Sequence, residues 1–138
     1  MSATVSATIT KEAMTAGFPA RIPAIEGDIT LKELLRIFQH LIACAQSTVT
    51  NYHALNFLYL VVPTELWALY SNTAYPQAPG NPGTIPPYHQ NNTPLQNEVI
   101  KQAFLSARKH YEEFIHMNKA LTERFLTLIP PEYVQGYN

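Results

Sequence analysis

The longest regular stretch of the sequence reads TPLQNEVIKQAFLSARKHYEEFIHMNKALTERFLTLI, at residues 93–129. It opens with a threonine, a proline and, three residues after the threonine, a glutamine, which together are typical of a capped helix N-terminus. Apolar side chains then recur at alternating steps of four and three from Ile100 to Leu128, with Asn118 as the polar interruption. Pro130 and Pro131 end the pattern. We predict one long amphipathic helix at 94–129, about 54 Å long at roughly 1.5 Å per residue, and leave open a break near 117–119.

A second amphipathic helix is predicted to begin after Thr30. Thr30 and Glu33 have the spacing of a capping box. Apolar residues follow at three- and four-residue steps from Leu31 to Ala45, so we expect one side of this helix to pack into a core. The opposite side is polar and carries Lys32, Arg36, Gln39, His40 and Gln46. The helix is predicted to end near residues 47–50.

The middle of the chain is densely apolar. A short buried helix and a strand fit residues 57–62 equally well, and a further helix is predicted at 64–70. The fold class that follows is an all-α domain, a compact bundle of four to five helices. The side chains expected to form its core are Leu34, Leu35, Phe38, Leu41, Ile42, Phe57, Leu58, Leu60, Trp67, Phe104, Tyr111, Phe114, Leu121 and Phe125.

Two segments are predicted to lie outside these helices. Residues 1–28 are expected to form an extended, partly flexible N-terminal arm, because Pro19 and Pro23 prevent a long helix. Within the arm, residues 1–15 are interpreted as a mobile tail, whereas residues 22–25 are apolar enough to pack. Residues 75–93 contain five prolines and two glycines, which rules out a helix or an interior strand. We predict a Pro-rich loop there, within a helical domain at 29–138.

Charged side chains are scarce in this sequence of 138 residues. They make up 14% of it, against about 25% in a typical soluble domain, and the formal net charge is −1. A net charge near zero favours association, and the lack of a basic excess argues against binding nucleic acid over the whole surface. Residues 66–97 hold no Asp, Glu, Lys or Arg. Burial accounts for the first part of that segment but not for the loop, so we expect the loop to contact neighbouring molecules.

The compartment is inferred from three further observations. Cys44 is the single cysteine, so the chain has no internal disulfide. The longest purely apolar run covers the six residues 57–62, whereas a membrane helix needs about 20. The first ten residues lack the charged and apolar regions of a secretory signal. We expect a soluble cytoplasmic chain with no membrane contact.

Candidate catalytic and metal-binding residues are few. His110, Glu112, Glu113 and His116 lie close together, but their order is not the His-Glu-x-x-His of a zinc protease. Arg108 and Lys109 stand four residues before the two glutamates, which favours ordinary ion pairs on a helix.

Cys44 and His53 are the candidate nucleophile and base, but no third residue suggests itself to orient them, and a free cysteine is commonly a small core residue. We predict no enzyme activity, metal, cofactor or small-molecule substrate.

Several segments together resemble a known family. They are Val61-Val62-Pro63, Leu66-Trp67-Ala68-Leu69-Tyr70, Pro79-Gly80-Asn81-Pro82-Gly83, Ile85-Pro86-Pro87, residues 108–114, Met117-Asn118-Lys119-Ala120-Leu121, residues 126–129 and Glu132-Tyr133. In this order they resemble the Gag-like capsid region of copia-type long-terminal-repeat retrotransposons, especially divergent copies in unicellular eukaryotes, over residues 22–137. The resemblance implies an all-helical capsid domain that multimerises into a shell around the RNA of the element. Members of the family often continue into a zinc knuckle, which this sequence lacks, so RNA is expected to bind mainly through regions missing from this chain.

The function that we predict is structural: a self-assembling, homo-oligomeric Gag-like capsid unit of a virus-like particle. The alternative is a helical adaptor that binds another protein through the Pro-rich loop. The residues predicted for self-association are Tyr75, Pro79, Pro82, Ile85 and Tyr88 in the loop and Arg36, Gln39 and His40 on the polar side of the first long helix. Lys101, Arg108 and Lys109 are the candidate contacts to RNA phosphates.

Overall fold

The computed structural model describes residues 6–50, 52 and 56–134, and all statements below refer to these residues. They form three α-helices, α1 (Lys11–Ala16), α2 (Leu31–Gln46) and α3 (Pro94–Leu126). Three short 3-10 helices complete the secondary structure: η2 (Leu58–Leu60), η3 (Thr64–Leu69) and η4 (Pro131–Tyr133). No strand occurs in this part of the chain, where the β-pairing is an isolated bridge between Val49 and Asn56. The all-α class is confirmed. Residues 57–62, for which a helix and a strand were both left open, contain the 3-10 helix η2, and the helix expected at 64–70 is the 3-10 helix η3.

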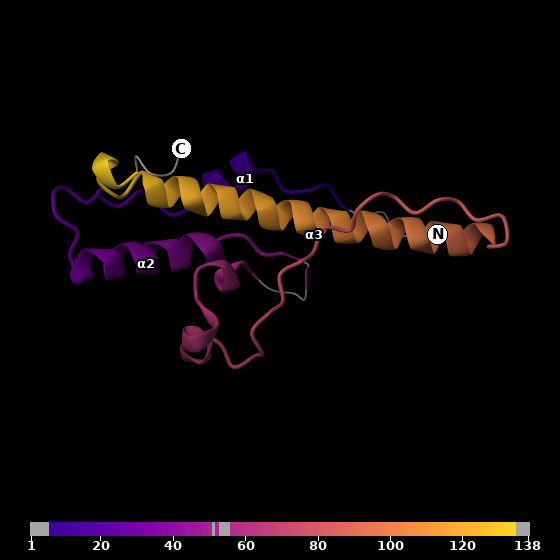
Figure 1. Ribbon diagram of the computed structural model, residues 1–138, viewed down its shortest axis with the longest axis horizontal. Coiled ribbons are helices and arrows are strands. Elements are labelled where there is room, and N and C mark those ends of the chain that lie inside the picture. The colour runs from indigo at the N-terminus through magenta and orange to yellow at the C-terminus, as the bar shows by residue number, and fades with distance from the viewer. Residues whose placement is uncertain (1–5, 51, 53–55, 135–138) are drawn as a thin grey trace.

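Helix α3 runs along the whole length of the molecule (Figure 1). Helix α1 and helix α2 lie on either side of its C-terminal half, and both contact it. The Pro-rich segment runs beside its N-terminal half, where no other helix lies. The shape is therefore elongated, with α1 and α2 packed on α3 and η2 packed on α2.

The start of α3 follows directly from its sequence. The Thr93 hydroxyl accepts a hydrogen bond from the Gln96 backbone N–H at 3.1 Å, and the Gln96 side chain accepts one from the Thr93 N–H at 2.8 Å. Pro94 occupies the first helical position, where its missing N–H costs nothing. The helix then continues for 33 residues, about 50 Å at roughly 1.5 Å per residue. The predicted helix is confirmed, and it has no break at 117–119.

Helix α2 has the predicted bounds but buries a different part of its apolar side. The Thr30 hydroxyl caps it by accepting the Glu33 N–H at 3.3 Å. Burial begins only at Ile37, because α3 and the arm cover the helix from that point on. Leu34 and Leu35 are 43% and 53% exposed, so their prediction as core residues is wrong. The first turn of α2 extends beyond the elements that form the core.

The N-terminal arm is packed against the rest of the chain over its described length. The Thr10 side chain caps α1 by accepting the Ala13 N–H at 3.1 Å. Met14 and Phe18 are buried in the main core. The prediction of a mobile tail is therefore wrong for residues 6–15, while residues 1–5 lie outside the described residues. The predicted packing of residues 22–25 is confirmed, since Ile25 is buried.

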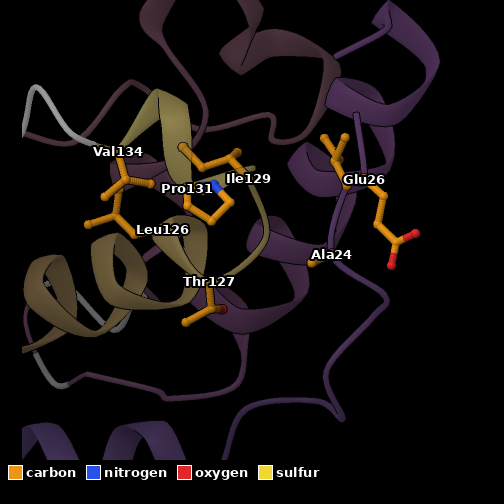
Figure 2. A pocket seen from close by; sticks show the side chains of 8 residues that line it. Ala24, Glu26, Leu126, Thr127, Ile129, Pro131 and Val134 are labelled. Atoms are coloured by element: carbon orange, nitrogen blue, oxygen red, sulfur yellow. The ribbon is translucent and has the colours of Figure 1, made fainter. Parts of the chain in front are cut away.

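The end of the N-terminal arm meets the segment that follows the last turn of α3. The Ile25 N–H donates to the Leu128 carbonyl at 2.8 Å, and Ile25 packs with Ile37, Leu128 and Ile129 in a second apolar cluster. Figure 2 shows Ile129 between the arm and η4, beside a shallow pocket of about 620 Å³. The arm is thus joined to the end of α3 as well as to its middle.

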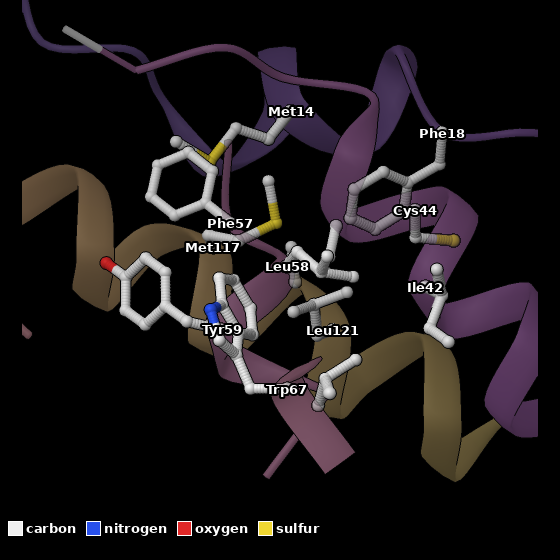
Figure 3. Packing of buried hydrophobic residues seen from close by; sticks show 13 residues of the cluster. Met14, Phe18, Ile42, Cys44, Phe57, Leu58, Tyr59, Trp67, Met117 and Leu121 are labelled. Atoms are coloured by element: carbon white, nitrogen blue, oxygen red, sulfur yellow. The ribbon is translucent and has the colours of Figure 1, made fainter. Parts of the chain in front are cut away.

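The main core lies between the arm, α2, η2, η3 and α3 (Figure 3). Six of the predicted core residues are buried: Ile42, Phe57, Leu58, Trp67, Phe104 and Leu121. Six more are partly buried: Phe38, Leu41, Leu60, Tyr111, Phe114 and Phe125. The sequence analysis missed buried residues contributed by the arm and by the other side of α3, notably Met14, Phe18, Met117 and Ala120.

Candidate interaction surfaces

The first part of the Pro-rich loop is anchored to the core. The Tyr75 hydroxyl donates to the Tyr59 carbonyl at 2.8 Å, and its ring meets the Trp67 indole edge-on with the ring centres 5.3 Å apart. The Trp67 indole N–H donates to the Thr73 carbonyl at 2.9 Å. Tyr75, which we predicted to mediate self-association, is therefore mainly an internal anchor, although part of its ring is exposed.

The second part of the loop lies along α3. Pro82 and Ile85 line a groove together with Phe104 and Tyr111 of α3. At the far end, the Asn97 side chain of α3 donates to the His89 carbonyl at 3.1 Å. The second part of the predicted loop, residues 79–93, therefore packs along the helix, and we call it the strap.

The predicted contact residues of the strap differ in their exposure. Pro79 and Pro82 are half-buried, so they offer little surface. Ile85 and Tyr88 are exposed, at 54% and 71%, and remain available to a partner.

An exposed apolar group surrounds the start of α3. Leu95 and Val99 are 70% and 60% exposed, and Ile100 lines one pocket with Ile85 and Tyr88 of the strap. We call these five residues the tip patch. The sequence analysis placed only two of them, because Leu95 and Val99 precede the heptad-like seam and no neighbouring element covers them.

A second exposed apolar group lies at the first turn of α2. Leu31, Leu34 and Leu35 are all exposed there, and the stripe continues into a groove of about 370 Å³ that Phe38 and Leu41 help to line. We call the three leucines the α2 patch. The predicted contact residues of this helix were its polar ones. Gln39 is exposed and Arg36 is half-buried, whereas His40 is buried and that prediction is wrong.

His40 is buried because it joins three segments. The Arg124 guanidinium of α3 donates to His40 Nε2 at 3.0 Å and to the Pro19 carbonyl of the arm at 3.1 Å. Burial, together with the nearby positive charges of Arg124 and Arg36, lowers the pKa of His40. The imidazole is therefore neutral at pH 7, with Nε2 unprotonated so that it can accept the arginine N–H.

The Cys44 thiol lies 3.6 Å from the same His40 nitrogen and is fully buried. Burial raises its pKa, so the thiol stays protonated and is a poor nucleophile. His53, the base that we considered for it, lies outside the described residues.

Glu113 and His116 of α3 both bind the backbone of Ile9. The Glu113 carboxylate, which is 0% exposed, accepts the Ile9 N–H at 2.9 Å. His116 Nδ1 lies 2.8 Å from the Ile9 carbonyl oxygen, and it must carry the proton because a carbonyl only accepts. Lys109 is also buried, with its Nζ 3.3 Å from the Glu113 carboxylate, so its prediction as a phosphate contact is wrong. These roles depend on the arm backbone, and no local sequence pattern signals them.

The other basic candidates for RNA contact are separate. Lys101 is exposed, and Arg108 is exposed but paired with Glu112 at 2.8 Å. The predicted four-residue ion pairs, Arg108 with Glu112 and Lys109 with Glu113, are both confirmed. Across the residues that the structure describes, no group of three or more His, Cys, Asp or Glu side chains could hold a metal. The remaining positive charge makes a weak phosphate site at best.

The pocket between the arm and the C-terminal end of α3 is lined mainly by apolar side chains. Leu126, Ile129 and Val134 form one wall, and Glu26 supplies the carboxylate on the opposite side (Figure 2). One exposed carboxylate beside aliphatic side chains lacks the paired groups that acid–base chemistry needs.

Comparisons of this chain with protein families, with curated proteins and with solved structures each give no match. None of the described helices has both the length and the hydropathy that crossing a bilayer requires.

Proposed function

We propose that this chain is a structural unit that associates with copies of itself through apolar surfaces, as a Gag-like capsid subunit does. The observation that carries the proposal is the α2 patch. Its leucines continue the stripe that packs into the core from Ile37 onward, yet they are left exposed. Monomeric proteins rarely leave extended apolar patches in contact with water, and such patches commonly mark interfaces.

The second support is the tip patch. It lies at the opposite end of α3 from the α2 patch, so one copy offers two separate apolar surfaces (Figure 1). A unit with two such surfaces can bind a neighbour at each end, which is what extended assembly requires. The net charge of −1 produces little repulsion between copies.

The capsid proposal includes a virus-like particle that encloses retrotransposon RNA. Its support is the resemblance of the loop and of residues 108–121 to Gag-like capsid sequences. Lys101 and Arg108 are the exposed cations that remain for RNA on the N-terminal half of α3. We therefore assign RNA contact mainly to regions other than this domain, and assign no catalytic role to the chain.

Sedimentation velocity over a concentration series, with and without RNA, tests this function. We expect oligomers to form as the concentration rises, and the variant Leu31→Gln/Leu35→Gln to form fewer of them. Ala43→Gln is the matched control, because Ala43 is exposed on the same helix outside the patch. A chain that stays monomeric up to several hundred micromolar, with and without RNA, would contradict the proposal.

One observation favours the alternative, a helical module that binds another protein. The strap presents Ile85 and Tyr88 outward from a segment without charged residues, and exposed aromatic side chains are enriched at protein interfaces. A strictly monomeric chain would favour this function. Tyr88→Ser would then be expected to abolish binding of the partner without changing the fold.

A further inference from the structure

Side chains of α3 bind the backbone of the N-terminal arm as well as its buried side chains. Glu113 accepts the Ile9 N–H at 2.9 Å, and His116 donates to the Ile9 carbonyl at 2.8 Å. Both polar groups of one arm residue are therefore held by side chains one helical turn apart on α3. A site that binds a backbone N–H and C=O in this way recognises an extended segment by its main chain.

The arm stays in contact with α3 for the rest of its length. Lys11 forms an ion pair with Glu123 at 2.8 Å. Arg124 donates to the Pro19 carbonyl at 3.1 Å, with its guanidinium carbon 5.3 Å from the centre of the Phe18 ring. Residues 6–25 thus lie along α3 from about Leu105 to its C-terminal end, on a helix about one hundred positions away in the sequence.

The connection between the arm and α2 is a short exposed turn. Residues 26–28 are all exposed, and Gly27 has a φ of +81°, which favours glycine. Within the described part of the chain, these three residues take part in no hydrogen bond or ion pair. The contacts of the docked arm therefore do not require that residues 26–28 connect it to the same chain. An arm from another copy could make every one of these contacts.

An empty arm site would be unfavourable. Without the arm, Glu113 loses its hydrogen bond from Ile9, and Arg124 loses its hydrogen bond to Pro19. Met14 and Phe18 would also leave the main core, which exposes apolar surface to water. An arm that leaves its site must therefore be replaced, and another copy carries an identical replacement.

We propose that residues 6–25 form an exchangeable arm, which in the assembled state docks onto α3 of a second copy of this chain. The proposal rests on the proposed function, because it requires that copies associate. Exchange of an identical element connects two copies without any new interface and is a low-cost route to oligomers. Copies associate through the two apolar patches, and the exchanged arms then link the associated copies.

Cross-linking between two variants that each carry one added cysteine tests the exchange. Lys11 and Glu123 are both accessible and their side chains meet in the docked arm. A Lys11→Cys chain and a Glu123→Cys chain are mixed at a concentration at which oligomers form, and treated with a short bismaleimide. We expect covalent dimers from the mixture. The wild-type chain, whose Cys44 is fully buried, should give none.

Two controls define the result. The double variant Lys11→Cys/Glu123→Cys, diluted to the monomer, should form an intrachain link, which establishes that the two sites are within reach. A mixture of Lys11→Cys with Lys32→Cys, whose side chain is exposed on α2, gives the background of random contact. A yield equal to that background, in a sample that contains oligomers, would overturn arm exchange and leave self-association standing. The absence of oligomers would overturn both.

A charge swap provides an independent measurement. Lys11→Glu and Glu123→Lys each place like charges together in their own chain, whereas an exchanged dimer of the two variants restores both ion pairs. We expect native mass spectrometry to find mixed dimers above the half of all dimers that random pairing gives. Lys11→Glu/Glu123→Lys, mixed with wild type, should show the opposite bias, because exchanged arms then meet like charges. A random distribution in both mixtures would count against exchange.

Discussion

Replacing Glu113 should destabilise the fold more than any other single polar substitution in α3. Its carboxylate is 0% exposed, accepts the Ile9 N–H and lies 3.3 Å from the Lys109 ammonium. Glu113→Ala leaves Lys109 as a buried charge without its partner and the Ile9 N–H without its acceptor. Removing one member of a buried ion pair costs about 3–5 kcal/mol. Domains of this kind have roughly 5–15 kcal/mol of total stability, so the loss is a large fraction of it.

The comparison of three variants separates the contributions. Glu113→Gln keeps an acceptor for Ile9 but leaves the buried ammonium unpaired, so it should recover only part of the loss. Lys109→Met/Glu113→Gln removes the charge as well and should return to within about 1.5 kcal/mol of wild type, because an apolar side chain replaces a buried ion. Arg108→Ala/Glu112→Ala is the control, since that pair is exposed and is expected to change stability by less than about 1 kcal/mol.

Urea denaturation followed by circular dichroism measures these differences, with the transition midpoint and slope fitted together. The thermal midpoint of Glu113→Ala should fall by roughly 10 °C or more. The reasoning would be refuted if Glu113→Ala lost less than about 1 kcal/mol, or if it lost no more than the exposed control pair. Either result would mean that the arm contact at Ile9 contributes little to the fold.

Three further predictions follow from burial and charge. The pKa of His40 lies below its usual value of 6.5, so the unfolded chain binds the proton at a higher pH than the folded chain does. The free energy of unfolding of the wild type should therefore fall as the pH drops through about 6.5, and level off below the lowered pKa. In urea denaturation between pH 7.5 and 5.5, His40→Gln should show a weaker decline, because its side chain does not titrate and can still accept from Arg124. Met14→Ala should cost about 2–5 kcal/mol because Met14 is 1% exposed, and an unchanged midpoint would contradict the packed arm. Phe57→Ala should lower the free energy of unfolding by about 3–5 kcal/mol, whereas Leu35→Ala should lower it by under about 1 kcal/mol. Equal losses in calorimetry would contradict the finding that Leu35 lies outside the core.

The features that the sequence predicted are those decided by neighbouring residues. The cap of α3 needs only Thr93, Pro94 and Gln96, all within four positions, and it forms as expected. The ion pairs of Arg108 and Lys109 follow from a spacing of four on one helix. Local geometry alone determines both, so no knowledge of the rest of the fold was needed.

The buried face of α3 could not be read from the sequence in the same way. Lys109, Glu113 and Arg124 are polar, and polar residues on a helix are expected to face water. Glu113 and Arg124 find their partners in backbone atoms of Ile9 and Pro19, which carry no sequence signal, and Lys109 is buried beside Glu113. A pattern of side chains in the sequence does not predict a hydrogen bond to backbone atoms of a distant segment.

The leucines of α2 show a different limit. Leu31, Leu34 and Leu35 belong to the same periodic stripe as the residues that do enter the core. Periodicity indicates that a face will be covered, but it does not indicate whether the cover comes from the same chain. The apolar periodicity that led us to predict the α2 patch as core is the same periodicity that now supports the proposed interface.

The length of α3 has a consequence for any assembly that uses both apolar patches. The tip patch lies at its first turns, whereas the α2 patch lies near its opposite end, and the strap lies along the N-terminal half of the helix (Figure 1). Adjacent copies would then be spaced by a rod of about 50 Å. Removing seven residues from the strap-covered part, which is close to two turns, would shorten that repeat by roughly 10 Å while keeping the faces in phase. In such an assembly, the residue count of α3 would set the spacing between neighbouring subunits.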